Sequence, residues 1–260
     1  MTSTNIACRY NTMLLSATEK EEEVVWQDHT PILGDIAAWR ARFPWATVAN
    51  IAGRFDVYDD DLAHLAGMHK VFLYGCSNIT DAGLAHLRGV HTLMMGGCWR
   101  ATDAGLAHLA GVHTISMRGC NSITDAGIAH LKGVHTLTID DCPGITDEGL
   151  AHLAGIHSLS IVRGNITDAG LAHIRGVRDL TIRGCTRITD AGVALLDEVH
   201  SLVMTSCPNV SDAALPSLKS LRYLDARNTS ITPAALLTLK GKGVEMPEDT
   251  PIPPPVPLFP

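Results

Sequence analysis

Apolar residues recur along the chain with a fixed period of 22 residues. The sequence reads ITDAGLAHLRGVHTLMMGGCWR from Ile79 and ITDAGIAHLKGVHTLTIDDCPG from Ile123. Self-similarity at such a period is the signature of a repeat architecture. The step is one residue shorter near Asn165 and again near Thr229. Further copies begin at Val57, Ala101, Ile145, Ile166, Ile188 and Val210, and a truncated copy begins at Ile231.

Each unit carries the pattern of a short strand and a short helix. Leu93 and Met95 alternate with open positions, which is typical of a strand. Thr80 is suited to cap a helix of about two turns, and Asp81 lies favourably near the positive end of its dipole. Gly89 is expected to end the helix in the left-handed conformation.

A single unit is too small to fold alone. Burying one of its apolar side chains contributes about 1.5–3 kcal/mol, but only against neighbouring units. We therefore predict an α/β solenoid of about 8 repeats of 22 residues, with parallel strands on the concave face and short helices on the convex face. The apolar set of one unit is Ile79, Leu84, Leu87, Val90, Leu93 and Met95.

The motif L-x-x-L-x-L-x-x-C followed by I-T-D-x-G-L resembles the cysteine-containing leucine-rich repeats of F-box/LRR proteins and of GALA-type bacterial effectors. The resemblance covers residues 57–246 and implies a horseshoe that binds other proteins. It suggests a substrate-recognition arm in ubiquitin ligation, or an effector. The repeats here are shorter than those of the family, and residues before the first strand lack the leucine-proline start and leucine-rich helices of an F-box.

The repeats divide the chain into four parts. Trp39 and Phe43 share one face of a short helix that is expected to stop before Pro44, and residues 47–51 can supply a first strand. The acidic run at residues 19–23 is typical of flexible chain. The proline run at the C-terminus favours the polyproline II form, either as a ligand for SH3 or WW domains or as a solvated end. The parts are an acidic segment (1–34), an N-terminal cap (35–56), the leucine-rich-repeat domain (57–246) and a proline-rich tail (247–260).

Cysteine recurs once in most units. Because stacked parallel strands lie about 4.8 Å apart, these thiols should form a ladder and pack as small apolar groups. A metal or redox chain is the alternative, but no C-x-x-C or tetrahedral ligand set supports it. The column is Cys76, Cys98, Cys120, Cys142, Cys185 and Cys207.

Histidine forms two columns, one on the helices and one just before the strands. The H-x4-H spacing within a unit is not that of a zinc protease, so no metal site is expected. Protonation near pH 6 would place like charges side by side, and we expect stability to fall from about pH 7 to pH 5. The outer column is His64, His86, His108, His130, His152 and His173, and the inner column is His69, His91, His113, His135, His157 and His200, with Arg178 in one unit.

The positions that flank the core leucines point out of the concave sheet and vary between units. Aromatic residues and arginines at such positions are the usual anchors of protein interfaces. For Phe72 and Tyr74 the alternative is that the N-terminal segment covers them as a cap. The predicted partner-binding residues are Lys70, Phe72, Tyr74, Met94, Trp99, Arg118, Asp140, Arg163, Arg183, Asp225 and Arg227.

Composition narrows the class of function. The net charge of −7 argues against a nucleic-acid or anionic-membrane surface. No Walker loop and no G-x-S-x-G is present, so we expect no enzyme and no cofactor. No signal peptide or membrane span is apparent, which favours a monomer in the cytoplasm or nucleus with another protein as its partner. The alternative is a structural component of a larger assembly.

Overall fold

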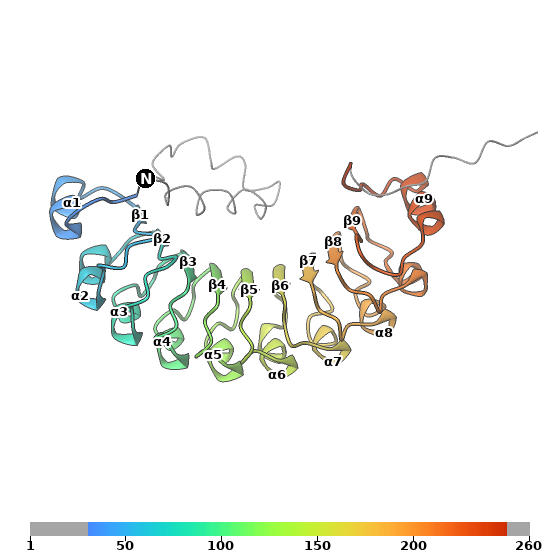
Figure 1. Ribbon diagram of the computed structural model, residues 1–260, viewed down its shortest axis with the longest axis horizontal. Coiled ribbons are helices and arrows are strands. Elements are labelled where there is room, and N and C mark those ends of the chain that lie inside the picture. The colour runs from blue at the N-terminus through green and yellow to red at the C-terminus, as the bar shows by residue number, and fades with distance from the viewer. Residues whose placement is uncertain (1–30, 249–260) are drawn as a thin grey trace, which may run out of the picture.

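The computed structural model describes residues 31–248 and confirms the predicted solenoid. Nine parallel strands in these residues form one sheet on the inner side of an arc, and short helices line its outer side (Figure 1). The strands are β1 (Val48–Asn50), β2 (Lys70–Phe72), β3 (Thr92–Gly96), β4 (Thr114–Arg118), β5 (Thr136–Asp140), β6 (Ser158–Val162), β7 (Asp179–Arg183), β8 (Ser201–Thr205) and β9 (Tyr223–Asp225). The acidic run at residues 19–23 and the proline run lie outside the described residues.

The helices are shorter than the predicted two turns, since most contain four or five residues. After α3 the amides of His86 and Leu87 bond to the carbonyls of Gly83 and Leu84, three residues back. The backbone therefore tightens and returns to the sheet within one repeat. The helices are α1 (Ile36–Arg42), α2 (Asp59–Leu62), α3 (Asp81–Ala85), α4 (Asp103–Ala107), α5 (Asp125–Ala129), α6 (Asp147–Leu150), α7 (Asp168–Leu171), α8 (Asp190–Val193) and α9 (Pro233–Gly241), with 3-10 turns at Ala63–Leu65, Ala151–Leu153 and Asp212–Ser217.

The strand register follows the sequence period. Leu93 pairs with Ile115, 22 residues later. Between β6 and β7 the offset falls to 21, with Ser158 opposite Asp179. This confirms the deletion near Asn165, which the chain absorbs in the turn between the two units without a break in the sheet.

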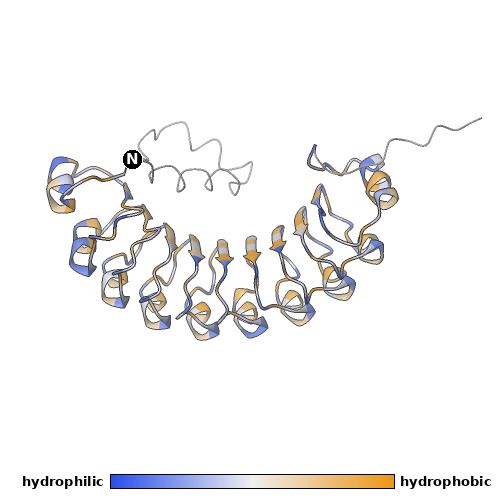
Figure 2. Cartoon of the chain, in the orientation of Figure 1, coloured by the Kyte–Doolittle hydropathy of each residue, from blue (hydrophilic) through white to orange (hydrophobic). Residues whose placement is uncertain are grey.

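One continuous core runs through the arc between the sheet and the helices. The six apolar positions of the unit that begins at Ile79 are all buried. Apolar residues recur in every strand and helix along the arc (Figure 2). Gly89 has a φ of 78°, as expected for a left-handed helix end. Each unit is thus covered on two sides by its neighbours.

Helix α1 and the residues before it lie at the N-terminal end of the repeat array. Helix α1 ends at Arg42, and the rings of Trp39 and Phe43 lie 5.9 Å apart, in agreement with the predicted helix before Pro44. The buried Ile32 donates its amide to the carbonyl of Asn50 over 2.7 Å. The chain therefore reaches the sheet beside the end of β1.

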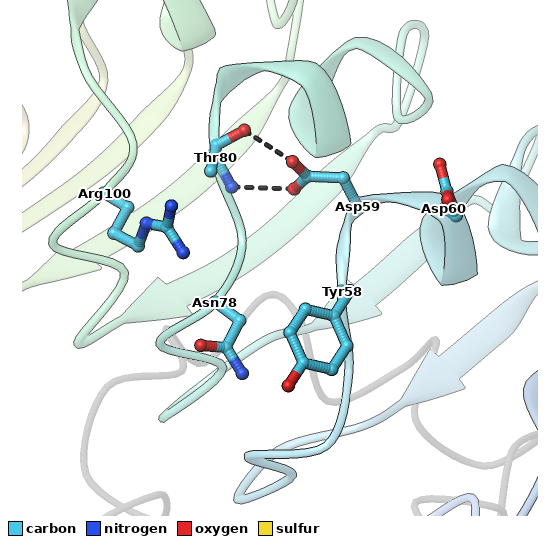
Figure 3. Close-up of a pocket in the computed structure, with 6 residues that line it drawn as sticks. All are labelled: Tyr58, Asp59, Asp60, Asn78, Thr80 and Arg100. Atoms are coloured by element: carbon cyan, nitrogen blue, oxygen red, sulfur yellow. Dashed lines mark hydrogen bonds between the residues drawn. The ribbon is translucent and has the colours of Figure 1, made fainter.

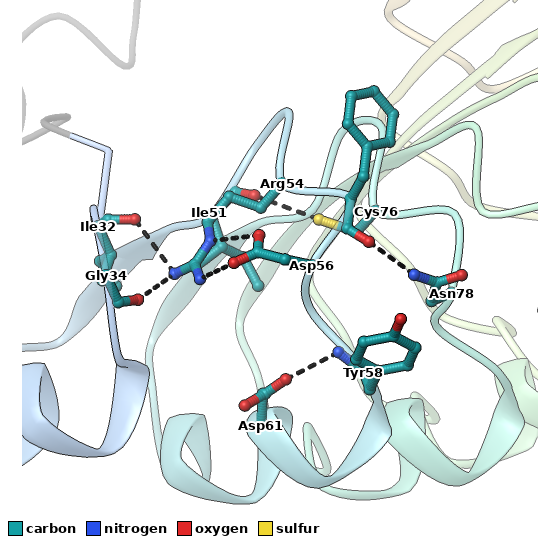
Figure 4. A network of polar contacts seen from close by, with 10 residues as sticks. Ile32, Gly34, Ile51, Arg54, Asp56, Tyr58, Asp61, Cys76 and Asn78 are labelled. Carbon is teal, nitrogen blue, oxygen red and sulfur yellow. Dashed lines mark hydrogen bonds and ion pairs between the residues drawn. The ribbon is translucent and has the colours of Figure 1, made fainter.

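Arg54 fastens this end of the solenoid (Figure 4). Its guanidinium donates to the carbonyl of Gly34 at 2.6 Å and to the Asp56 carboxylate at 2.6 Å. The Cys76 thiol of the next unit donates to the carbonyl of Ile51. Arg54 thus stands one repeat before Cys76, at the equivalent position of its unit. Its guanidinium group joins residues 32–34 to the turn that contains Asp56.

Candidate functional site

The concave surface consists of three parallel rows of side chains. Register places the first row at the start of each strand, the second in the middle and the third at the end. The rows contain most of the predicted binding residues. They are Lys70, Thr92, Thr114, Thr136, Ser158, Asp179, Ser201 and Tyr223; Phe72, Met94, Ser116, Thr138, Ser160, Thr181, Val203 and Asp225; and Tyr74, Gly96, Arg118, Asp140, Val162, Arg183, Thr205 and Arg227.

Two of the predicted residues are not exposed, and the expectation that they are was wrong. Phe72 is only 7% exposed: it lies in the middle row of the concave surface between Asn50 and Met94, and the Lys70 amine lies 5.1 Å from the centroid of its ring. Asp225 is 3% exposed, because its carboxylate accepts hydrogen bonds from the guanidinium of Arg227. These two side chains therefore leave little area for a partner to contact.

Tyr74 lies across the neighbouring strands. Its hydroxyl donates to the Ser116 Oγ at 3.0 Å and lies 3.8 Å from the Met94 sulfur. A Cβ at Gly96 would meet the Tyr74 ring at 2.8 Å, so glycine at this position allows the ring to lie flat over β3. Burial raises the pKa of the Tyr74 hydroxyl. The ring, the hydroxyl and the thioether form a half-buried apolar patch over β2–β4.

A charged cluster follows on the next strands. The Asp140 carboxylate lies 3.1 Å from the Arg118 Nε and 2.8 Å from an Arg163 Nη, and Asp141 lies 3.8 Å from Arg163. The Asp140 carboxylate is mostly covered, whereas about half of each arginine side chain is exposed. The structure thus brings together three predicted residues and presents two oriented guanidinium groups.

Arg163 shares a left-handed backbone conformation with Asp141 and Ser206, which stand at the equivalent turn position of other units. Its φ is 53°, in the left-handed region, where the equivalent turn residues Gly119 and Gly184 also lie. A Cβ in this region costs about 1–2 kcal/mol.

Three buried polar atoms of the described residues have no hydrogen-bond partner: Ser160 Oγ, Arg183 Nε and His200 Nδ1. They lie on β6, on β7 and just before β8. A buried donor without a partner costs about 1–3 kcal/mol.

The inner histidine column forms a stacked ladder. From His69 to His157 adjacent rings lie 4.4–4.5 Å apart at interplanar angles of 13–18°. The last imidazole lies 3.6 Å from the Asp179 carboxylate, which the sequence did not single out. Burial and the charges of His157 and His113 lower the pKa of His135 below its usual 6.5. Protonation of His135 is therefore disfavoured in the folded chain.

We expect the melting temperature to fall as pH drops from about 7 to 5. Because the pKa of His135 is lower in the folded chain, the unfolded chain binds a proton first as pH falls. The contribution of neutral His135 to the free energy of unfolding is therefore fully present above the unfolded pKa of about 6.5 and is lost as pH falls below it. Each ~1 kcal/mol lost corresponds to about 2–4 °C for a domain of this size. Calorimetry of wild type and His113→Gln/His135→Gln would measure this. A wild-type melting temperature independent of pH would refute the prediction, as would a variant with the full pH dependence.

The aspartates at the helix starts form a second ladder that sequence reasoning missed. The Asp103 carboxylate accepts from the amide and the hydroxyl of Thr124 in the next unit, each at 2.7 Å. The same pair of bonds recurs from Asp59 to Asp212. A Cβ at Gly127 would clash with the Asp103 carboxylate, and this explains the glycine of T-D-A-G. The repeated T-D-x-G motif is the feature of the sequence from which this ladder could have been predicted.

The cysteine column is buried and its six thiols are free. Burial raises the pKa of Cys76 to about 11 and that of Cys98 to about 12. The thiol of Cys207 donates to the carbonyl of Ile182 in the preceding unit. These contacts agree with a packing role. Within residues 31–248 no three His, Cys, Asp or Glu side chains are grouped to hold a metal ion, and no helix there is long and apolar enough to cross a bilayer.

Figure 3 shows a pocket in the first units, lined by residues that belong to none of the three concave rows. Tyr58, Asn78 and Arg100 line it together with Asp59, whose carboxylate bonds to Thr80 as the first rung of the aspartate ladder. None of the predicted binding residues lines this pocket. Trp99, which is 56% exposed, lies in the turn after β3 and outside the three rows.

No protein-family model and no curated protein sequence matches this chain. Solved structures do resemble it. An internalin (InlF) from Listeria monocytogenes has a TM-score of 0.61 and 19% identity over 84% of this chain and 64% of that chain. The leucine-rich-repeat domain of the type III effector XopL gives 0.54 and 17% over 81% and 78%. TLR13 in its complex with ssRNA13 gives 0.56 and 14% over 77% and 35%.

At these identities the similarity concerns the fold. This chain spans about a third of the TLR13 chain and about two thirds of the internalin. The parallel strands of this chain form one open sheet in sequence order, with helices on its outer side. The described residues form a leucine-rich-repeat solenoid.

Proposed function

We propose that the chain binds another protein through the part of its concave surface formed by Arg118, Asp140, Arg163 and Arg183. The observation that carries the proposal is the cluster in which one covered carboxylate orients two half-exposed guanidinium groups beside the orphaned Arg183 Nε. Planar guanidinium forks bind carboxylates bidentately, and arginine is enriched in interface hot spots. Tyr74 and Met94 supply an apolar anchor beside them.

The resemblance to F-box/LRR and GALA-type repeats supports a finer proposal. The chain would act inside the cell as a substrate-recognition arm for ubiquitin ligation, working through an adaptor, or as an effector that captures a host protein. The cysteine column and the I-T-D-x-G-L motif support this assignment. Recovery of ubiquitin-ligase scaffold components with the captured partner would distinguish the first role from the second.

Arg163→Gly is the sharpest test of the binding surface. Glycine relieves the left-handed strain at this turn and removes only surface ion pairs worth about 0–1 kcal/mol, so we expect the melting temperature to be unchanged or raised. Partner recovery in affinity purification from the native cell should fall at least about tenfold, equivalent to ~1.4 kcal/mol. The matched control is His86→Ala/His130→Ala on the exposed outer column. Equal partner recovery by wild type, Arg163→Gly and the control would contradict the proposal.

A further inference from the structure

The concave surface changes in character along the arc in a defined order. Tyr74 and Met94 form an apolar patch over β2–β4, and the charged cluster of Arg118 and Arg163 follows over β4–β6. Arg183 on β7 continues the basic row. A ligand that runs across the strands from β1 therefore meets apolar groups first and guanidinium groups second.

The chain's own N-terminal region has the same order when it is followed back from the sheet. The chain joins the sheet at Ile32, whose amide bonds to the Asn50 carbonyl at the end of β1. Preceding it are Val24, Val25 and Trp26, and before these stand the glutamates of residues 19–23, EKEEE. The apolar residues of the segment and the glutamates before them therefore follow the same order as the apolar patch and the arginines of the concave surface.

The lengths also match. With strands about 4.8 Å apart, Met94 lies about 10 Å from β1, Arg118 about 14 Å and Arg183 about 29 Å. An extended chain spans about 3.3–3.6 Å per residue, so Trp26 can lie up to ~20 Å and Glu23 up to ~30 Å from Ile32. Asn50 and Ser160 belong to the same middle row, so the segment starts in line with one of the orphaned polar atoms.

We propose that residues 19–26 dock in cis on the concave surface, with Trp26 and its valines against Tyr74 and Met94 and the glutamates on Arg118, Arg163 and Arg183. This inference rests on the proposed function, because the segment then competes with the outside partner for one surface. It also defines that partner's chemistry: an acidic segment beside an apolar anchor. Carboxylates supply acceptors for the half-exposed guanidinium groups of Arg118 and Arg163.

A labelled peptide of residues 17–30 added to the full chain tests the proposal by fluorescence anisotropy. In wild type the tethered segment has an effective concentration of about 1 mM and should exclude the peptide. The variant Glu19→Gln/Glu21→Gln/Glu22→Gln/Glu23→Gln releases the site. We expect it to bind the peptide at least about tenfold more tightly than wild type does. Adding Arg163→Gly and Arg183→Ala should abolish the gain.

The matched control removes the same charge elsewhere, at the exposed residues Asp60, Glu148, Asp197 and Glu198, each changed to its amide. It should bind the peptide as weakly as wild type. Equal affinity for wild type and the glutamine variant, or no measurable binding to that variant, would overturn docking in cis. Affinity purification with the glutamine variant distinguishes failure of docking in cis from failure of the proposed function. If the glutamine variant captures the partner and loses it when Arg163→Gly is added, the surface binds proteins without the segment.

Discussion

Gly127→Ala is expected to lower the free energy of unfolding by about 2–4 kcal/mol, from overpacking and from lost hydrogen bonds to a charged group. The added Cβ would occupy the place of the Asp103 carboxylate, which bonds to both the amide and the hydroxyl of Thr124. Gly127 is buried between two units, so the Asp103 carboxylate must swing away from the new Cβ and lose its two bonds to Thr124. Urea denaturation followed by circular dichroism measures the change.

Two comparisons make this result specific. Gly241→Ala places a Cβ in open space at the end of α9 and should leave stability equal or slightly higher, by up to about 1 kcal/mol. In an Asp103→Ala background Gly127→Ala should cost much less than it does alone, because the clashing carboxylate is gone. Strict additivity of the two changes would show that the aspartate ladder does not require the glycine.

Leu137→Ala in β5 is expected to cost about 2–5 kcal/mol, as do other buried leucine truncations. Leu137 is fully buried and pairs with Ile115 and Leu159, so the cavity opens at the centre of the array where units press on it from both sides. Thermal unfolding of the full chain measures the loss. Thr138→Ala, the next residue on the same strand, faces the concave surface and should change stability by less than about 0.5 kcal/mol. Equal effects of the two substitutions would contradict the assignment of faces.

The period and the alternation of the sequence were sufficient to predict the sheet, the core and the solenoid. Leu93 and Met95 are both buried, as their alternation with open positions predicts. Every unit repeats this alternation, so a wrong assignment of faces in one strand would conflict with the neighbouring strands. The short helices were harder to predict. Their length is set by the need to close a repeat, and the bonds of His86 and Leu87 that tighten the turn leave no mark in the sequence.

Contacts that cross from one unit to the next explain what was missed at the site. Phe72 alternates like an exposed residue, yet Lys70 and the flanking strands cover it. The Asp103–Thr124 bonds join residues 21 apart, and Asp103 looked like an ordinary helix-start residue. The pairing of Asp140 with Arg163 depends on a turn one unit away. Sequence reasoning found the charged residues but could not tell which would meet.

Cross-linking mass spectrometry of the full chain bound to its captured partner tests directly whether the partner binds on the concave surface. A short linker reactive toward acidic and basic side chains would record where the partner lies. We expect cross-links to the partner to map to concave residues around Lys70, Asp140 and Asp179 and to be lost in Arg163→Gly. Cross-links concentrated on the outer helices, at residues such as Lys132 and Glu148, would contradict this expectation.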